Sequence, residues 1–352
     1  MALHAAQTDD TLTHAIVGLG NPLLDILADV TPAFLAKYHL ELNNAILADA
    51  SHAPMFDELQ RAFEPVFVAG GATQNSVRIA QWMLNAYNKH ATSFFGSVGR
   101  DSHGATLEAC AEADGVNVSY LKHDGIKTGT CAVCVANSER SLVADLSAAN
   151  HFHEDHLATA ASQAIIAKGQ YFYTAGFHLT VSPPSVMALA EHAKAHNKVL
   201  LVNLSAPFVV EFFHEPLMAA LAFADYVFGN ESEAKTLGKV QHWGDDVATI
   251  ALKTAQLQKA SGSRCRTVVF TQGADATIVV HEGKVHRFEV PSIAASSIVD
   301  TNGAGDAFVG GFLSRLALKQ PLDKCVQAGH WAAQVVLTRS GCTFPETCDY
   351  RE

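Results

Sequence analysis

The amino-acid sequence predicts an α/β fold in which helices cover both faces of a mostly parallel β-sheet. Short apolar segments typical of strands alternate with amphipathic segments typical of helices over nearly all 352 residues. Such alternation implies right-handed crossovers between parallel strands. Two strand-rich regions, residues 26–68 and 128–146, interrupt the alternation. We expect these two regions to pair into one small sheet that lies over the large domain as a lid.

The elements of the large domain are recognised by the spacing of their apolar residues. The predicted strands, rich in branched and aromatic side chains, are Ala15–Leu19, Thr92–Ser97, Tyr171–Ala175, Val199–Val202, Tyr226–Phe228 and Thr267–Phe270. The predicted helices, in which apolar residues recur at helical spacing, are Asn75–Lys89, Pro183–His196 and Ala304–Leu318. Strands separated by helices in this way are typical of parallel pairing.

The two interrupting regions differ from each other in pattern. The first mixes short apolar strands with a helical stretch around His52–Phe63. The second, Thr128–Leu146, has apolar runs on both sides of Asn137–Arg140, which predicts a β-hairpin. We therefore expect a large domain and a small lid domain. The large domain is assigned residues 1–23, 72–122 and 148–352, and the lid domain is assigned residues 24–71 and 123–147.

Composition and charge limit what the protein does. An apolar content of 49% is well above that of a disordered chain. The net charge of −11 argues against a general nucleic-acid binder, which would have to neutralise phosphates with Lys and Arg. The segment Met1–Thr13 lacks the apolar run of a signal peptide, and no stretch approaches the roughly 20 apolar residues of a membrane span. We expect a cytoplasmic monomer that binds neither nucleic acid nor membrane.

Two groups of residues resemble metal or redox motifs but are explained more simply. Cys131 and Cys134 form a C-x-x-C within a predicted strand, where positions three apart face opposite ways. A zinc or redox pair is therefore disfavoured, and seven scattered cysteines suit a reducing compartment. His151, His153 and His156 lack the H-E-x-x-H spacing of a metal-binding helix, so a solvated loop is favoured.

A glycine-rich stretch near the C-terminus carries the strongest chemical signal. Residues 298–311 read I-V-D-T-N-G-A-G-D-A-F-V-G-G, in which a strand gives way to a helix at about Gly305. Because Gly303, Ala304 and Gly305 have little or no side chain, their backbone amides can approach an anion at the positive end of the helix. Asp306 follows in the first turn, where a carboxylate can accept the proton of an alcohol. Phosphoryl transfer needs these two elements together.

The alternative for Asp306 is that it only caps the helix. A lone G-x-G would favour that alternative, but the complete D-T-N-G-A-G-D is more specific. The stretch is neither a Walker A loop, because no Lys follows the glycines, nor the six-residue dinucleotide fingerprint. Since the helix dipole favours the anion, we expect the pKa of Asp306 not to be raised far.

The stretch at residues 298–311 resembles the C-terminal signature of the ribokinase-like (PfkB-type) kinases. Further matching segments follow in order along the chain and resemble the adenosine kinase branch of that family. They are GNPLLD at 20–25, AGGATQN at 69–75, TGT at 128–130, AGF at 175–177, NLSAPF at 203–208, FGNESE at 228–233, FTQG at 270–273 and GCTFP at 341–345. Most of them directly follow a predicted strand, and ligands of open α/β sheets bind at the carboxyl ends of strands. We therefore expect them to converge on one crevice.

The resemblance implies a ribokinase-like fold and the reaction of ATP with adenosine to give ADP and AMP, with Mg²⁺. It also implies the residues that bind the nucleoside. Asn21 and Asp25 are expected to meet it, with Asp25 accepting hydrogen bonds from the ribose hydroxyls. Gly70 and Gly71 are expected to let the backbone approach the sugar, and Asn75 to bond a ribose hydroxyl.

The remaining expected site residues also come from the resemblance. Those forming the apolar wall around the purine are Leu23, Leu47, Cys131, Leu142 and Phe208, with Phe177 and His178 beside it. Arg140, at the hairpin tip, is expected to reach the phosphates. Asn230 and Glu233 match an N-x-x-E motif thought to organise Mg²⁺ through water, although a helix cap also explains Asn230. Those expected beside the ATP are Thr271, Gln272, Gly273, Asn302 and His330.

The sequence departs from the family pattern at three positions. Ala72 replaces an expected Ser, Ala45 an expected Gln, and His178 stands where an aromatic ring usually lies against the purine. Three other functions compete with adenosine phosphorylation. A kinase of the same fold could act on another nucleoside or a sugar, a nucleoside-binding regulator would lack the base, and a nicotinamide oxidoreductase would need the missing fingerprint.

Overall fold

The computed structural model describes residues 10–42, 44–136 and 139–351. Within that range, the larger sheet has nine strands in the order β14-β13-β12-β11-β10-β9-β1-β5-β6. Its strands are β1 (Ile16–Leu19), β5 (Thr92–Gly99), β6 (Asn117–His123), β9 (Tyr171–Ala175), β10 (Val199–Asn203), β11 (Tyr226–Asn230), β12 (Thr267–Gln272), β13 (Asp275–His281) and β14 (Lys284–Phe288). All pairs from β6 to β12 are parallel, whereas β13 and β14 pair antiparallel. The predicted α/β fold with a mostly parallel sheet is confirmed.

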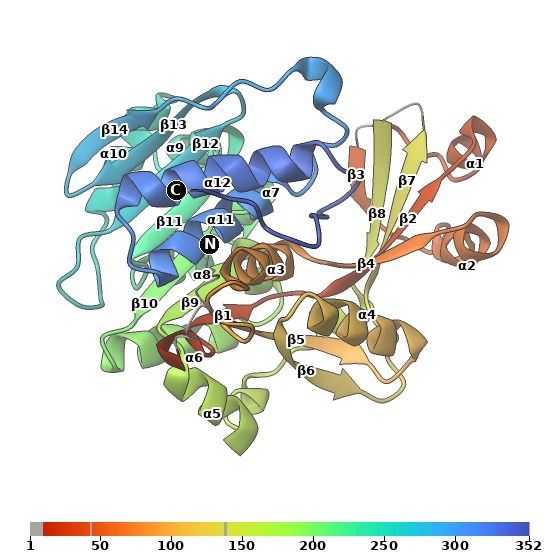
Figure 1. The fold of residues 1–352 in the computed structure, drawn as a ribbon, viewed down its shortest axis with the longest axis horizontal. Helices are drawn as coiled ribbons and strands as arrows, with labels where there is room; N and C mark the ends of the chain where they lie inside the picture. The colour runs from red at the N-terminus through yellow and green to blue at the C-terminus, as the bar shows by residue number, and fades with distance from the viewer. Residues whose placement is uncertain (1–9, 43, 137–138, 352) are drawn as a thin grey trace, which may run out of the picture.

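Helices cover both faces of this sheet, and Figure 1 shows α3, α11 and α12 on the face toward the viewer. Those three are α3 (Ala72–Leu84), α11 (Ala304–Ala317) and α12 (Leu322–Leu337). The opposite face is packed by α5 (Ala160–Lys168), α6 (Pro183–Ala195), α8 (His214–Leu221), α9 (Glu231–Val240) and α10 (Val247–Gln256). Between the layers lie two apolar clusters, which contain Phe172 and Phe270 on one face and Phe228 and Phe312 on the other.

The helix predicted at Asn75–Lys89 begins earlier and ends earlier than the spacing indicated. It starts at Ala72, directly after Gly71, whose φ of 93° favours glycine. It ends at Leu84, and the residues that follow form a turn in which polar side chains make local hydrogen bonds. Asn88 accepts from the His90 amide at 2.7 Å and donates to Thr13 at 3.1 Å. Asparagine competes with helical hydrogen bonding in this way.

The two strand-rich regions pair, as predicted, into one smaller sheet with the order β3-β8-β7-β2-β4. Its strands are β2 (Leu23–Asp29), β3 (Asn44–Leu47), β4 (Val66–Gly70), β7 (Thr130–Ala136) and β8 (Glu139–Asp145). Helices α1 (Pro32–Lys37) and α2 (Ala53–Ala62) cover its outer face, at the right of Figure 1. Cys131 and Cys134 lie in different apolar clusters on opposite faces of β7, and both are free thiols.

The inner face of the small sheet is not covered by α1 and α2 and lines a cavity. Side chains alternate along each strand, so the strand that places Ile26 against α1 and α2 places Leu23 and Asp25 on the other side. The remaining connections are α4 (Ser102–Ala113), which packs between the two sheets, and α7 (Pro207–Phe212), which follows β10. Among the described residues, no helix is both long enough and apolar enough to cross a membrane.

Candidate functional site

A cavity of about 820 Å³ lies between the carboxyl ends of the large-sheet strands and the inner face of the small sheet. Six of the segments that were expected to converge contribute residues to its lining. Residues 20–25 contribute Asn21, residues 175–177 contribute Phe177, and residues 203–208 contribute Ser205. Residues 228–233 contribute Asn230, residues 270–273 contribute Thr271, and residues 298–311 contribute Asp306. The convergence follows from topology, because the parallel strands all end at the same edge. The binding roles assigned to these residues stay predictions.

The small sheet supplies most of the apolar wall. Leu23, Cys131 and Leu142 line the cavity from β2, β7 and β8. Leu47 lines it from β3 with 66% of its surface exposed, and Phe208 lines it from α7 with 43% exposed. Exposed apolar side chains that gather at the rim of one cavity are typical of a ligand-binding groove. The expected purine-facing residues are thus brought together around one mouth.

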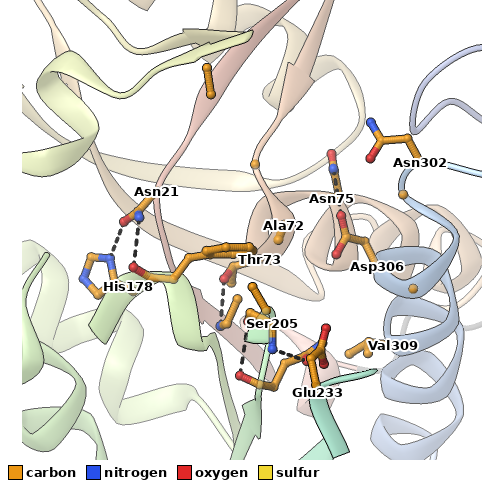
Figure 2. Close-up of a pocket in the computed structure, with 18 of the residues that line it drawn as sticks. Asn21, Ala72, Thr73, Asn75, His178, Ser205, Glu233, Asn302, Asp306 and Val309 are labelled. Carbon is orange, nitrogen blue, oxygen red and sulfur yellow. Dashed lines mark hydrogen bonds between the residues drawn. The ribbon is translucent and has the colours of Figure 1, made fainter. Parts of the chain in front are cut away.

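The first turn of α11 forms the other side of the cavity. Gly303 caps the helix in the left-handed region, with φ 77°, and a Cβ there would lie 2.9 Å from the Cβ of Cys342. Gly305 has open space where a Cβ would be, so an anion can approach its amide closely. Asp306 is the third helical residue and accepts a hydrogen bond from Asn75 Nδ2 at 3.1 Å (Figure 2).

Burial controls the charge of the carboxyl groups in this cavity. It raises the pKa of Asp306 to about 7; the hydrogen bond from Asn75 opposes the shift and the negative charge of Glu233 adds to it. Burial likewise raises the pKa of Asp25 to about 7, against the opposing charge of Arg78. The expectation that the pKa of Asp306 is not raised far was wrong, because desolvation outweighs the helix dipole.

Asn21 and His178 form a pair at one end of the cavity (Figure 2). Asn21 Nδ2 donates to the Phe177 carbonyl at 3.3 Å, and its Oδ1 lies 2.7 Å from His178 Nδ1. A carbonyl only accepts, so the amide orientation is fixed and His178 Nδ1 carries the proton. The imidazole is fully buried, which lowers its pKa to about 3 and keeps it neutral. His178 therefore orients Asn21.

Asn230 and Glu233 form the capping box of α9. The Glu233 amide donates to Asn230 Oδ1 at 2.9 Å, and Asn230 Nδ2 donates to Glu233 Oε1 at 2.7 Å. Both residues also line the cavity, so capping and ligand binding are compatible. Burial raises the pKa of Glu233 to about 7. One carboxylate beside one amide suits Mg²⁺ that keeps most of its waters. The described residues contain no group of three or more acidic, His or Cys side chains placed to hold a metal.

Some expected residues lie beside the cavity instead of lining it. Gly70 backs Asp25, because a Cβ there would come within 2.2 Å of the carboxylate. His330 is buried in α12, with Nε2 2.8 Å from Thr277 Oγ1. Gln272 donates to the Ala276 carbonyl at 2.6 Å, within the β12–β13 turn that also contains Gly273. Ala304 was also expected in the site, but it does not line the cavity.

Arg140 is not at a turn as expected. It is the second residue of β8 and pairs with Val135 of β7, because β8 already begins at Glu139, within the polar run. Its side chain lies outside what the structure describes, as do the neighbouring Asn137 and Ser138. The phosphate contact assigned to Arg140 stays a prediction.

Other lining residues were missed in the sequence. Thr73 accepts from the Ala175 amide at 3.0 Å, and Ser205 accepts from the Gly176 amide at 2.7 Å. Both lie inside the segments that carried the family resemblance, so they could have been named from it. Val309, which lies one turn after Asp306 in α11, also faces the cavity. Helical spacing would have identified it.

Comparison with known proteins gives a consistent result. Residues 34–348 match the model of the pfkB family of carbohydrate kinases. The chain is 50% identical to adenosine kinase 2 of Arabidopsis thaliana over 336 residues, which is 95% of this chain and 97% of that protein. The crystal structure of Anopheles gambiae adenosine kinase in complex with P1,P4-di(adenosine-5) tetraphosphate has 43% identity and a TM-score of 0.86, covering 95% of this chain and 99% of the other.

A second structural relative is more distant in sequence and equally close in fold. Adenosine kinase from Schistosoma mansoni in complex with adenosine is 31% identical, with a TM-score of 0.87, and the match covers 96% of this chain and 98% of that one. The ribokinase-like fold expected from the resemblance is confirmed by these neighbours. The match in family, in sequence and in structure extends over nearly the whole chain, and the protein accordingly belongs to the pfkB carbohydrate kinase family, within its adenosine kinases.

Proposed function

We propose that the protein transfers the γ-phosphoryl group of ATP to the 5′-hydroxyl of adenosine, giving ADP and AMP. The observation that carries this proposal is the meeting, in one cavity, of Asp306, Gly303 and Gly305 with Asp25 and Asn75. The first group of residues suits phosphoryl transfer. The second suits a sugar with free hydroxyls, since a carboxylate accepts hydrogen bonds and an amide donates them.

Each protein group has a distinct task in this reaction. Asp306 accepts the proton of the 5′-hydroxyl, and a pKa of about 7 poises it near neutral pH. The amides at the start of α11 stabilise the charge on the phosphoryl group in transit. Asn230 and Glu233 would hold Mg²⁺ through water, and the ion would neutralise charge on the nucleotide phosphates. Thr271 lies where the ATP is expected.

The apolar wall favours a nucleoside over a free sugar. Leu23, Cys131 and Phe208 line the cavity next to the polar groups that suit a ribose, and a purine has two apolar faces to bury against them. A sugar kinase of the same fold would have no use for this wall. Adenosine phosphorylation therefore accounts for more of the cavity than sugar phosphorylation does.

The small sheet is proposed to be a lid. Residues 24–71 and 123–147 would close over the nucleoside, and Leu47 and Phe208, both exposed here, would then be covered. Closure excludes water, which competes as the phosphoryl acceptor. We further propose that the enzyme works as a monomer in the cytoplasm, where its product would serve purine salvage.

Identification of the product tests the proposed function. The purified protein with Mg-ATP and adenosine should give AMP and ADP in equal amounts, and phosphorus NMR should place the new phosphate on the 5′-oxygen. Formation of ADP without AMP, or no consumption of adenosine, would contradict the proposal.

A further inference from the structure

Arg78 is a buried cation next to the site, and the reaction described above gives it no task. It lies in α3 with only 4% of its surface exposed. Its Nε donates to Asp114 Oδ2 at 2.6 Å. Its Nη1 contacts the Ala69 carbonyl, Asn75 Oδ1 at 3.3 Å and the Cys342 carbonyl at 3.2 Å. The guanidinium also lies over the ring of Phe344, 5.3 Å from its centroid.

Three of these partners belong to parts that form the site. Ala69 precedes Gly70, which backs Asp25. Cys342 packs against Gly303, the residue that caps α11. Asn75 is the residue that donates to Asp306. One guanidinium thus joins three parts: the glycine pair Gly70 and Gly71 at the end of β4, the start of α3, and the C-terminal segment behind residues 303–305, here called the anion loop.

The contact with Asn75 settles which way its amide faces. Arg78 only donates hydrogen bonds, so it holds the carbonyl oxygen of Asn75 and leaves Nδ2 for Asp306. An amide turned the other way would place Oδ1 against the carboxylate, and that contact would favour the protonated acid. The orientation of one amide therefore decides whether Asp306 keeps a donor to its ionised form.

We propose that Arg78 is a positioning residue, which holds Asn75 with its donor toward Asp306 and ties the sugar-binding glycines to the anion loop. The inference rests on the proposed function. Turnover of adenosine by the wild-type protein tests that function, whereas the ratio of kcat/KM in the variant to kcat/KM in wild type tests the role of Arg78.

Several other charged or titratable groups interact electrostatically with Asp306, and the variants used in the test leave them unchanged. They are Asp25 on β2, Tyr173 on β9, Glu233 on α9 and Cys342 in the C-terminal segment. The negative charge of Glu233 raises the pKa of Asp306, and the hydrogen bond from Asn75, whose amide Arg78 orients, lowers it. Loss of the arginine removes the donor arrangement and raises the pKa of Asp306, so activity should be lost at the acidic side first.

The test compares Arg78→Met with Arg266→Met. Arg266 is equally buried, with 2% exposed, and donates to the carbonyls of Leu221, Thr254 and Leu257, away from the cavity. Both variants should lose thermal stability. Only Arg78→Met should lose kcat/KM for adenosine, on the order of 10²-fold, with the acidic limb of its pH profile moved to higher pH. Equal kinetics and equal pH profiles in the two variants would overturn the proposal.

The conservative variant keeps the test decisive if Arg78→Met fails to fold. Arg78→Lys retains the charge but cannot reach Asp114 and the Asn75 oxygen together with two carbonyls. Compared with wild type, it should have a lower kcat/KM, a raised KM for adenosine and an acidic limb at higher pH. A lysine variant with wild-type KM and wild-type pH profile would also overturn the proposal.

Discussion

Asp306 is surrounded by protein on one side and open to the cavity on the other, and its pKa of about 7 follows from that burial. We predict that Asp306→Asn lowers kcat by about 10²–10⁴, the range for loss of a general base. Adenosine affinity should change little, because Asn keeps the size and part of the hydrogen bonding. Steady-state kinetics together with calorimetric titration of adenosine would measure both.

A matched variant separates catalysis from helix capping. Asp323 also lies in a first turn, that of α12, and is exposed away from the cavity. Asp323→Asn should leave kcat unchanged, because this residue lies away from the cavity. If Asp306 only caps α11, the two variants will behave alike in kinetics, and the assignment of the base would be wrong.

Asp25 allows a prediction about stability and pH. Its pKa in the folded protein, about 7, is above the ordinary value of 3.8. Its contribution to stability is therefore complete below the ordinary pKa and is lost as pH rises through about 7. Relative to wild type, Asp25→Asn should gain about 2 kcal/mol of unfolding free energy between pH 5 and pH 8.

Urea denaturation without nucleoside, at both pH values, measures this gain. Asp29→Asn, at the exposed end of the same strand, is the control. The same Asp25→Asn protein should bind adenosine more weakly than wild type. A stability difference that does not depend on pH would contradict the burial of an ionisable Asp25.

At the scale of elements, the geometry of the first turn of α11 allows a prediction that separates anion binding from stability. A Cβ at Gly305 meets no atom within 4 Å, so Gly305→Ala should fold normally and gain up to about 1 kcal/mol in helix propensity. The methyl group would occupy the space through which an anion approaches the amide. We expect kcat/KM for ATP to fall by tenfold or more, because the methyl group would weaken the hydrogen bond from the Gly305 amide to the anion. The melting temperature should not fall.

Gly303→Ala is the contrasting variant. Its φ of 77° and the contact with Cys342 make any side chain strained. Thermal denaturation should show a loss of stability that Gly305→Ala does not have. Full activity in Gly305→Ala would mean that the start of α11 does not hold the phosphates.

The strands and helices were predictable where local pattern determines them. The buried strands β1, β9 and β10 are continuous apolar runs, and their predicted ranges agree closely with the structure. The edge hairpin β13–β14 was not predicted, because four of the five residues of β14 are exposed and the strand pairs on one side only. The true start of α3 depended on Gly71, whose backbone conformation no side-chain pattern reveals.

At the scale of the whole molecule, the place of the site was predictable and its internal contacts were not. Topology alone brings the strand ends together, and the family resemblance named most of the lining residues. The pairs Asn75–Asp306 and Arg78–Cys342 join residues more than 200 positions apart in sequence. Such contacts depend on how whole layers pack, so the burial that raises the pKa of Asp306 was not accessible from the sequence.

The lid also makes a prediction for the whole molecule. If residues 24–71 and 123–147 exclude water on closure, ATP hydrolysis in the absence of adenosine should be slower than transfer to adenosine by several orders of magnitude. Release of ADP with and without adenosine measures the ratio. Comparable rates would show that the cavity does not protect the phosphoryl group from water, and the small sheet would then not be a lid.

The central claim is that the cavity selects adenosine as the acceptor for phosphoryl transfer. The most direct test is a single panel of kcat/KM values with Mg-ATP and adenosine, inosine, guanosine, ribose or fructose. The apolar wall formed by Leu23, Cys131 and Phe208 and the polar pair Asp25 and Asn75 predict far higher values for the nucleosides than for ribose or fructose. The match to adenosine kinases predicts that adenosine also exceeds inosine and guanosine. Equal or faster phosphorylation of ribose would contradict the claim, because the wall would then contribute nothing to binding.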